Sequence, residues 1–171
     1  ERRRQERAGV GDGALAWETA RWLVARRRVR PEQVYFVSLN NVHSAEEAQG
    51  TLALALGVQL GALPPAAAQR ALQTALPAGA LLVIDEAENA AHGGGLAFRR
   101  LLEALVQAPA APLVLVTSQR DVGSAYLPVY TLPRLHPQAV FDLFAAAINL
   151  TSAEVAALDH DDLTAVLQDV D

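Results

Sequence analysis

The sequence predicts an α/β fold, a three-layer arrangement in which a parallel sheet carries helices on both faces. The first observation behind this prediction is a pair of continuous apolar segments at residues 81–84 and 113–116. Such segments are typical of strands buried on both faces, as the inner strands of parallel sheets are. The second observation is the alternation of strand-like and helix-like segments along the chain. This alternation indicates parallel strands joined by right-handed crossovers.

The composition fits one compact domain with an aliphatic core. The chain has 171 residues, 51% hydrophobic and 19% charged, which is enough for a full core. Aromatic residues make up only 5%, so leucine, valine and alanine must fill the interior. Cysteine is absent, which excludes disulfides and thiolate metal sites. Methionine is absent even at position 1, and we therefore expect an excerpt of a longer protein, or a chain that lacks parts.

Charge and hydropathy limit the partners and the location. The net charge of −5 argues against a dedicated nucleic-acid binder, so direct nucleic-acid binding by this domain is not expected. Every basic side chain other than histidine is an arginine, because the sequence contains no lysine. No apolar run is long enough to cross a bilayer, and no signal-peptide pattern is present. We therefore expect a cytoplasmic protein without a membrane partner.

The first third of the chain predicts a glycine loop, a helix and a strand. Residues 1–7 are too strongly charged to form a buried strand. Three glycines alternate with other residues over positions 9–13, where they permit positive φ and a close backbone approach. Residues 14–28 are expected to form a helix whose last three residues are arginines. We interpret these arginines as a solvated helix terminus, which suits the negative pole of the helix, rather than as a nucleic-acid patch.

The remaining elements continue the same alternation. Pro31 ends the first helix, and a strand is expected at residues 34–39. Ser44 and Glu47 predict a capping box at the start of a helix that reaches about residue 56. A glycine-rich loop is expected at residues 88–95. The other strands are predicted at residues 81–85, 113–118 (fully buried) and 129–132, and the other helices at residues 66–76, 96–107, 137–147 and 152–170.

Two carboxylates, Asp85 and Glu86, directly follow the central apolar segment. Ligands bind at the carboxyl ends of strands in open α/β sheets, so acidic residues are suited to that edge. In the functional interpretation, Asp85 holds a magnesium ion through water, and Glu86 orients or deprotonates a hydrolytic water. In the alternative interpretation, the pair only caps the next helix. The two residues alone do not decide between these interpretations.

Four segments together carry a family resemblance. Residues 9–16 read Gly-Val-Gly-Asp-Gly-Ala-Leu-Ala, and residues 82–88 read Leu-Val-Ile-Asp-Glu-Ala-Glu. Residues 114–120 read Val-Leu-Val-Thr-Ser-Gln-Arg, and residues 132–135 read Leu-Pro-Arg-Leu. In this order they resemble the Walker A, Walker B, sensor and proline-leucine segments of the P-loop ATPase core of STAND signalling proteins. More narrowly, the chain is similar to the NB-ARC-like (AP-ATPase) domain of bacterial regulators.

The resemblance implies a P-loop NTPase-like fold over residues 1–150 and the start of a following helical segment at residues 151–171. It implies binding of ATP or ADP with Mg²⁺. Asp85 and Glu86 would be the catalytic residues, with Asp85 also the water-mediated ligand of the metal. The residues that the resemblance places at the nucleotide are Gly9, Val10, Gly11, Asp12, Gly13, Ala14, Thr117, Arg120 and Pro133.

The chain departs from the family pattern most clearly in Walker A. Asp12 stands in place of the lysine that reaches the phosphates, and Gly13 in place of the hydroxyl residue that holds magnesium. Two unit charges in contact interact by about 4 kcal/mol at an effective dielectric of about 20, so this exchange weakens triphosphate binding strongly. We favour the interpretation that Asp12 caps its own helix. The strand that should precede the glycine loop is not visible. Gln119 displaces Arg120 by one position, which is expected to point that arginine away from the site.

Three functions follow from these observations. We favour a nucleotide-dependent switch domain of a STAND-type signalling or transcriptional regulator, with hydrolysis impaired or lost. Its expected partners are neighbouring domains of a longer chain, and self-association through this domain is a further expectation. The alternative is a non-catalytic NTPase-like scaffold that mediates protein–protein assembly. A nucleic-acid motor or clamp loader is the least favoured. Asp12 and Gly13 leave open whether the domain is an enzyme.

Overall fold

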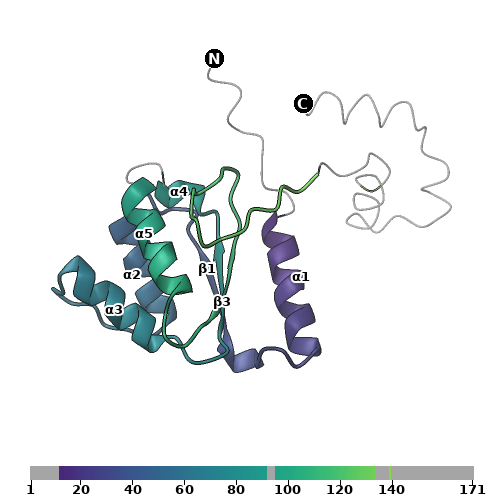
Figure 1. Cartoon of the computed structure of the whole chain (residues 1–171), viewed down its shortest axis with the longest axis horizontal. Helices are drawn as coiled ribbons and strands as arrows, with labels where there is room; N and C mark the ends of the chain where they lie inside the picture. The colour runs from purple at the N-terminus through teal and green to yellow at the C-terminus, as the bar shows by residue number, and fades with distance from the viewer. Residues whose placement is uncertain (1–11, 92–94, 134–138, 140–171) are drawn as a thin grey trace, which may run out of the picture. The chain divides into compact units, whose positions relative to one another are not determined.

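The computed structural model describes residues 12–91 and 95–133, together with Ala139 (Figure 1). Contacts along the chain group residues 8–129 into one compact unit, to which all elements described below belong. The helices predicted at residues 137–147 and 152–170 fall outside the described residues, apart from Ala139. In the described part of the chain, no helix is both long enough and apolar enough to span a membrane.

Three parallel strands form the sheet, in the spatial order β1-β2-β3. They are β1 (Val34–Ser38), β2 (Leu81–Asp85) and β3 (Leu113–Val116). The register pairs the first residues of all three strands, and Ser38 at the end of β1 lies beside Asp85 at the end of β2. The predicted parallel α/β sheet is therefore confirmed. The carboxyl ends of its strands share one edge, which is the edge that carries the candidate site.

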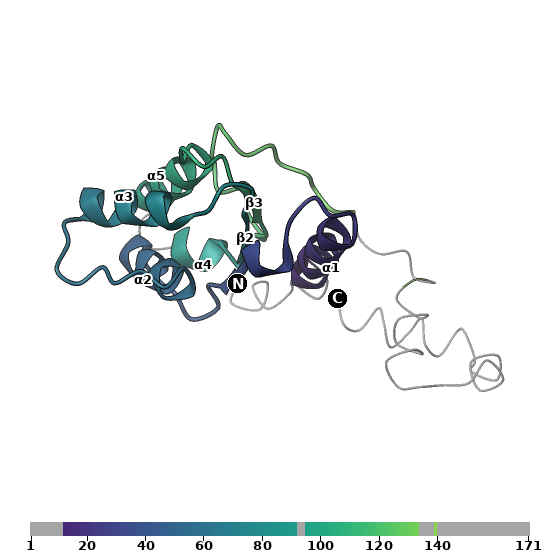
Figure 2. The same cartoon turned by 90° about the horizontal axis from the view of Figure 1, so that it is seen from below.

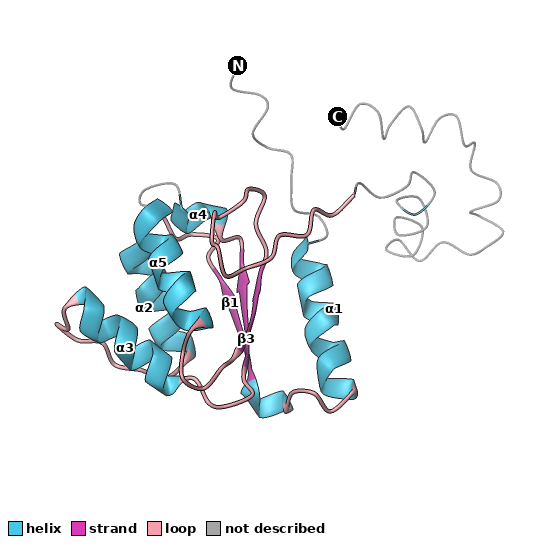
Figure 3. Cartoon of the chain, in the orientation of Figure 1, coloured by secondary structure: helices cyan, strands magenta, loops and turns pink. Residues whose placement is uncertain are grey.

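Helices cover both faces of this sheet, but unequally (Figures 1 and 2). One face is covered by α1 (Asp12–Ala25), which packs against β2. The other face carries α2 (Ala45–Ala55), α3 (Pro65–Ala75) and α5 (Gly95–Val106), with the short α4 (Glu88–Ala91) beside them. A 3₁₀ turn, η1 (Pro31–Gln33), leads into β1. Figure 3 shows the strands sandwiched between these two layers of helices.

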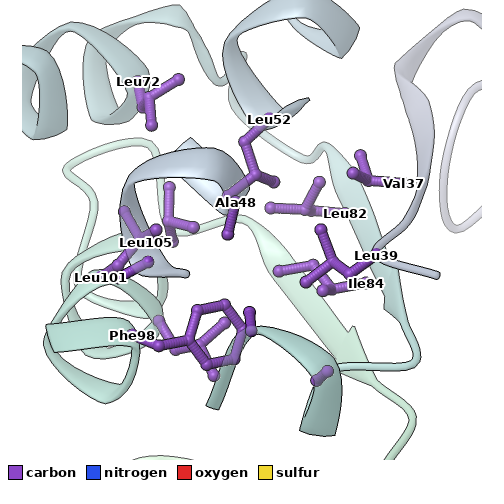
Figure 4. Packing of buried hydrophobic residues seen from close by; sticks show 14 of the residues in the cluster. Val37, Leu39, Ala48, Leu52, Leu72, Leu82, Ile84, Phe98, Leu101 and Leu105 are labelled. Carbon is purple, nitrogen blue, oxygen red and sulfur yellow. The ribbon is translucent and has the colours of Figure 1, made fainter. Parts of the chain in front are cut away.

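The side chains of β2 divide between two hydrophobic clusters, one on each face of the sheet. Leu82 and Ile84 belong to the larger cluster, which includes residues of α2, α3 and α5 (Figure 4). Leu81 and Val83 belong to the smaller cluster, which includes residues of α1. This division follows from the alternating directions of side chains along a strand. As predicted, the core is aliphatic, and Phe98 is the aromatic residue among its largest fully buried side chains.

The third strand differs from the prediction. A fully buried strand was expected over residues 113–118, but β3 ends at Val116, its first residue Leu113 is 48% exposed, and the next three residues are half-buried. The reason is that β3 is an edge strand: among the described residues, no strand pairs with its second side. The strand predicted at residues 129–132 is not formed either, and those residues are exposed. An extended segment without a hydrogen-bonded neighbour does not become a strand.

Two helix boundaries also differ from the prediction. The expected loop at residues 88–95 contains the short helix α4. The Asn89 side-chain amide holds this turn against the end of β1, since it lies 3.3 Å from the carbonyl oxygens of both Leu39 and Asn40. At the end of α1, the helix stops at Ala25, so that the three arginines that follow lie in a turn rather than in the helix.

Ser44 and Glu47 form the predicted capping interaction at the start of α2. The Glu47 N–H donates to Ser44 Oγ at 3.1 Å, and the Glu47 carboxylate accepts the N–H of His43 at 2.7 Å. Replacing Ser44 with alanine removes the first bond and is expected to lower the free energy of unfolding by about 1 kcal/mol. Urea denaturation followed by circular dichroism measures this loss. Ser44→Asp retains a capping oxygen and should stay near the parent value; equal losses in both variants would refute the capping role.

Candidate functional site

Polar side chains from three strand ends meet at the carboxyl edge of the sheet. Ser38 ends β1, Asp85 ends β2, and Thr117 directly follows β3. Glu86 follows Asp85 in the crossover connection. Parallel strands in register place their ends side by side, which is why residues almost 80 positions apart in the sequence become neighbours here.

Asp85 lies between Thr117 and the first turn of α1. The Thr117 hydroxyl donates a hydrogen bond to Asp85 Oδ1. On the other side, a Cβ atom added to Gly13 would lie 2.8 Å from Asp85 Oδ2 and 3.1 Å from Oδ1. The backbone of α1 therefore approaches the carboxylate at a distance that only glycine permits without displacement. Gly13 and Asp85, both of which the family resemblance places at the nucleotide, therefore lie side by side.

Glu86 adopts an unusual backbone conformation that Thr117 stabilises. Its φ of 59° lies in the left-handed region, which costs a non-glycine residue about 1–2 kcal/mol. Its N–H donates to Thr117 Oγ1 at 3.2 Å, and its carboxylate accepts the Ser38 hydroxyl at 3.1 Å. The Thr117 hydroxyl thus donates a hydrogen bond to the Asp85 carboxylate and accepts one from the backbone N–H of Glu86.

Backbone hydrogen bonds connect Thr117 to the end of β2 and to the residues that follow it. Its N–H donates to the carbonyl of Ile84 at 2.9 Å, and its carbonyl accepts the N–H of Ala87 at 3.0 Å. Thr117 is buried, and its hydroxyl contacts the two acidic residues. The contact of Thr117 with a nucleotide that the family resemblance implies stays a prediction.

Glu88 and Ser38 are parts of the site that sequence reasoning did not identify. Glu88 is a buried carboxylate at the first position of α4, and Glu88 Oε2 accepts the N–H of Gln119 at 3.3 Å. Ser38 binds Glu86, as described above. A signal for Ser38 existed, because it is a polar residue at the predicted end of an apolar strand. Glu88 had a weaker signal, an acidic residue two positions after Glu86.

Arg120 is exposed and lines an open hollow of about 430 Å³, and neither Asp85 nor Glu86 lines that hollow. The other residues lining the hollow are Glu88, Ala91, Gly95, Leu96, Arg99, Ser118, Asp121 and Val122. The expected effect of the one-residue displacement by Gln119 on the direction of the Arg120 side chain stays a prediction.

The remaining predicted site residues are distributed as follows. Asp12 is the first residue of α1, but its side chain is outside the described part. Ala14 is exposed on the first turn of α1. Pro133 is exposed and lies outside the compact unit of residues 8–129. Gly9, Val10 and Gly11 lie outside the described residues.

The donor set at this edge does not match the magnesium site that the family pattern implies. Magnesium requires nearly octahedral oxygen ligands, usually a carboxylate, waters and substrate phosphates. One oxygen of Asp85 is bonded to Thr117, and Gly13 offers no hydroxyl at the position where the family has one. In the part of the chain that the structure describes, no three His, Cys, Asp or Glu side chains are grouped to hold a metal. No step of the function proposed below depends on a metal ion.

Comparison of the chain with protein-family models, with curated proteins and with solved structures gave no match.

Proposed function

We propose that this chain is the nucleotide-binding domain of a STAND-type switch protein that binds ADP or ATP without hydrolysing it. The observation that carries the proposal is the contact between Gly13 and Asp85 at the carboxyl edge of a parallel sheet. In an α/β protein this edge is the usual ligand site, and a helix that begins there directs its N–H groups at an anion. In a longer regulator, neighbouring domains would change their contacts with this domain according to whether a nucleotide is bound.

The substitutions in the glycine turn support a switch without hydrolysis. Gly13 has no hydroxyl with which to hold magnesium at the phosphates. Glu86 accepts the Ser38 hydroxyl and Asp85 accepts the Thr117 hydroxyl, so donors of the protein itself orient both carboxylates. With Asp12 in place of the phosphate-binding lysine, binding rests on backbone N–H groups and is expected to be weak.

A second candidate function is a scaffold that uses the same fold without any nucleotide. The observation that favours it is the closed set of hydrogen bonds around Asp85 and Glu86. Among the described residues, no buried side-chain nitrogen or oxygen lacks a partner. A site whose buried side-chain polar atoms all have partners within the protein does not require a ligand to satisfy them.

Calorimetric titration of the full chain with ADP and ATP, with and without Mg²⁺, tests the proposal. We expect weak binding that is indifferent to Mg²⁺, and no ATP turnover above background. Asp12→Lys exchanges a repulsion for an attraction and should raise the affinity by more than about tenfold. Glu32→Lys, an equal charge change on an exposed residue of η1 at the amino ends of the strands, is the matched control and should leave the affinity nearly unchanged.

The outcomes separate the two candidates. No binding of either nucleotide, by the parent chain or by Asp12→Lys, would exclude the switch and leave the scaffold. Magnesium-dependent ATP hydrolysis that disappears in Glu86→Gln would contradict the loss of hydrolysis in both proposals.

A further inference from the structure

A dense group of arginines follows the end of α1. Residues 21–30 contain five arginines and no acidic residue, although the whole chain carries a net charge of −5. Arg21 is paired with Glu18 at 2.7 Å. The other four are exposed and form no ion pair within the described residues; they are Arg26, Arg27, Arg28 and Arg30. The negative pole of a helix accounts for one or two such charges, but four exceed that requirement.

Arg27 occupies a backbone position that normally favours glycine. Its φ is 55°, and its N–H donates to the carbonyl of Val24 at 2.9 Å. The N–H of Arg28 donates to the carbonyl of Leu23 at 2.9 Å. These two bonds define a Schellman motif, in which the left-handed residue after the helix is most often glycine.

The end of α2 shows the same motif with the expected residue. Gly57 has a φ of 69°, and its N–H lies 3.2 Å from the carbonyl oxygen of Leu54. The N–H of Val58 donates to the carbonyl of Ala53 at 2.8 Å. The chain therefore closes α2 with glycine but keeps an arginine in the strained position at α1. A left-handed residue that is not glycine motivates a functional hypothesis for its side chain.

Trp22 adds an exposed aromatic surface to this group. It is 54% exposed, and the Arg26 guanidinium lies 5.1 Å from the centre of a Trp22 ring. A guanidinium stacked on an aromatic ring keeps its edge N–H groups available for two-pronged bonds to a carboxylate. We call Trp22, Arg26, Arg27, Arg28 and Arg30 the arginine patch.

The arginine patch is remote from the candidate nucleotide site. Pro31 follows it at once and begins η1, which leads into the first residue of β1. The patch thus adjoins the amino ends of the strands, whereas Asp85 lies at their carboxyl ends. A ligand at the patch does not compete directly with one at Asp85.

We propose that the arginine patch is a docking surface for an acidic segment of a partner protein, a run of aspartates and glutamates. Each guanidinium matches the geometry of one carboxylate, and the pairing neutralises four like charges that fall within five residues of the chain. A short acidic segment fits better than a nucleic acid. The arginine patch is one small group of basic residues, and the net charge of −5 argues against the long basic stripe that a nucleic-acid backbone requires. This inference does not depend on the nucleotide site.

Fluorescence anisotropy of the full chain with a labelled peptide of about ten glutamates, about 35 Å long when extended, tests the docking surface. We expect saturable binding that weakens with salt. Arg26→Gln with Arg28→Gln should weaken it about tenfold, because each exposed ion pair contributes a factor of about two to five. Arg70→Gln with Arg100→Gln, on exposed positions of α3 and α5, is the matched control and should change affinity less than about twofold.

A separate variant distinguishes a binding role from a structural one. Arg27→Gly relieves the left-handed strain, so it should raise the thermal midpoint while it weakens peptide binding about two- to fivefold. The proposal fails if the parent chain does not bind the peptide, or if the control pair loses as much affinity as the patch pair. It also fails if a single-stranded oligonucleotide of equal charge binds more tightly at the same ionic strength, since the surface would then be a nucleic-acid site.

Discussion

Replacing Phe98 with alanine is expected to remove a large share of the folding free energy. Phe98 lies on α5 and is fully buried in the larger cluster, where Ile84 of β2 and Leu39 are also members (Figure 4). Truncating a buried phenylalanine costs about 3–5 kcal/mol, through lost burial and the cavity left behind. Domains of this size have total stabilities of about 5–15 kcal/mol, so the variant should be only marginally folded.

The position of Phe98 makes the loss larger than for an average core residue. The core is almost wholly aliphatic, and few side chains can move into an aromatic cavity without leaving their own contacts. Urea denaturation followed by circular dichroism should show a midpoint far below that of the parent chain. Leu96→Ala is the matched control, because Leu96 lies on the same helix and is 52% exposed. Its loss should not exceed about 0.5 kcal/mol. Similar losses in both variants would contradict the assigned packing of α5.

The parallel sheet could be predicted from the sequence because local patterns determine it. The apolar run of β2 ends at two acidic residues, and the boundaries predicted from that pattern agree with the structure. The capping residues of α2 also carry their signal locally, in the pair Ser44 and Glu47. The capping residues interact with neighbours in the sequence, and β2 is buried on both faces of the sheet, so that spacing and a continuous apolar run contain the necessary information.

Other features depend on the tertiary structure and could not be predicted. β3 has the apolar sequence of an inner strand, but its burial depends on whether another strand pairs with it. The role of Thr117 is a second example. Its sequence position indicates a residue that faces a ligand, whereas its hydroxyl contacts Asp85 and the N–H of Glu86. Those contacts require the left-handed φ of Glu86, which no local pattern indicated.

Replacing Gly13 with alanine is expected to destabilise the chain, although alanine normally favours a helix. The added Cβ would lie 2.8 Å from Asp85 Oδ2, closer than real Cβ contacts. Asp85 must then move, and its movement weakens the bond from the Thr117 hydroxyl. We expect a loss of about 1–3 kcal/mol in the free energy of unfolding, the usual cost of overpacking.

The same substitution should have the opposite sign when Asp85 is alanine. Without the carboxylate the clash disappears, and exchange of glycine for alanine within a helix then contributes up to about 1 kcal/mol of stability. The double-mutant cycle of Gly13→Ala and Asp85→Ala measures this coupling directly by urea denaturation. Glycine at position 50 of α2 provides the matched control, because a Cβ there would meet nothing within 4 Å.

Gly50→Ala should therefore be neutral or stabilising in both backgrounds, with no coupling to Asp85. If Gly13→Ala instead behaves like Gly50→Ala, α1 does not begin against the end of β2. The first turn of α1 would then be separated from Asp85, and the observation that places the start of α1 at the carboxyl edge of the sheet would be lost. A coupling of about 2 kcal/mol or more between Gly13 and Asp85 would support that basis without any assumption about which ligand binds.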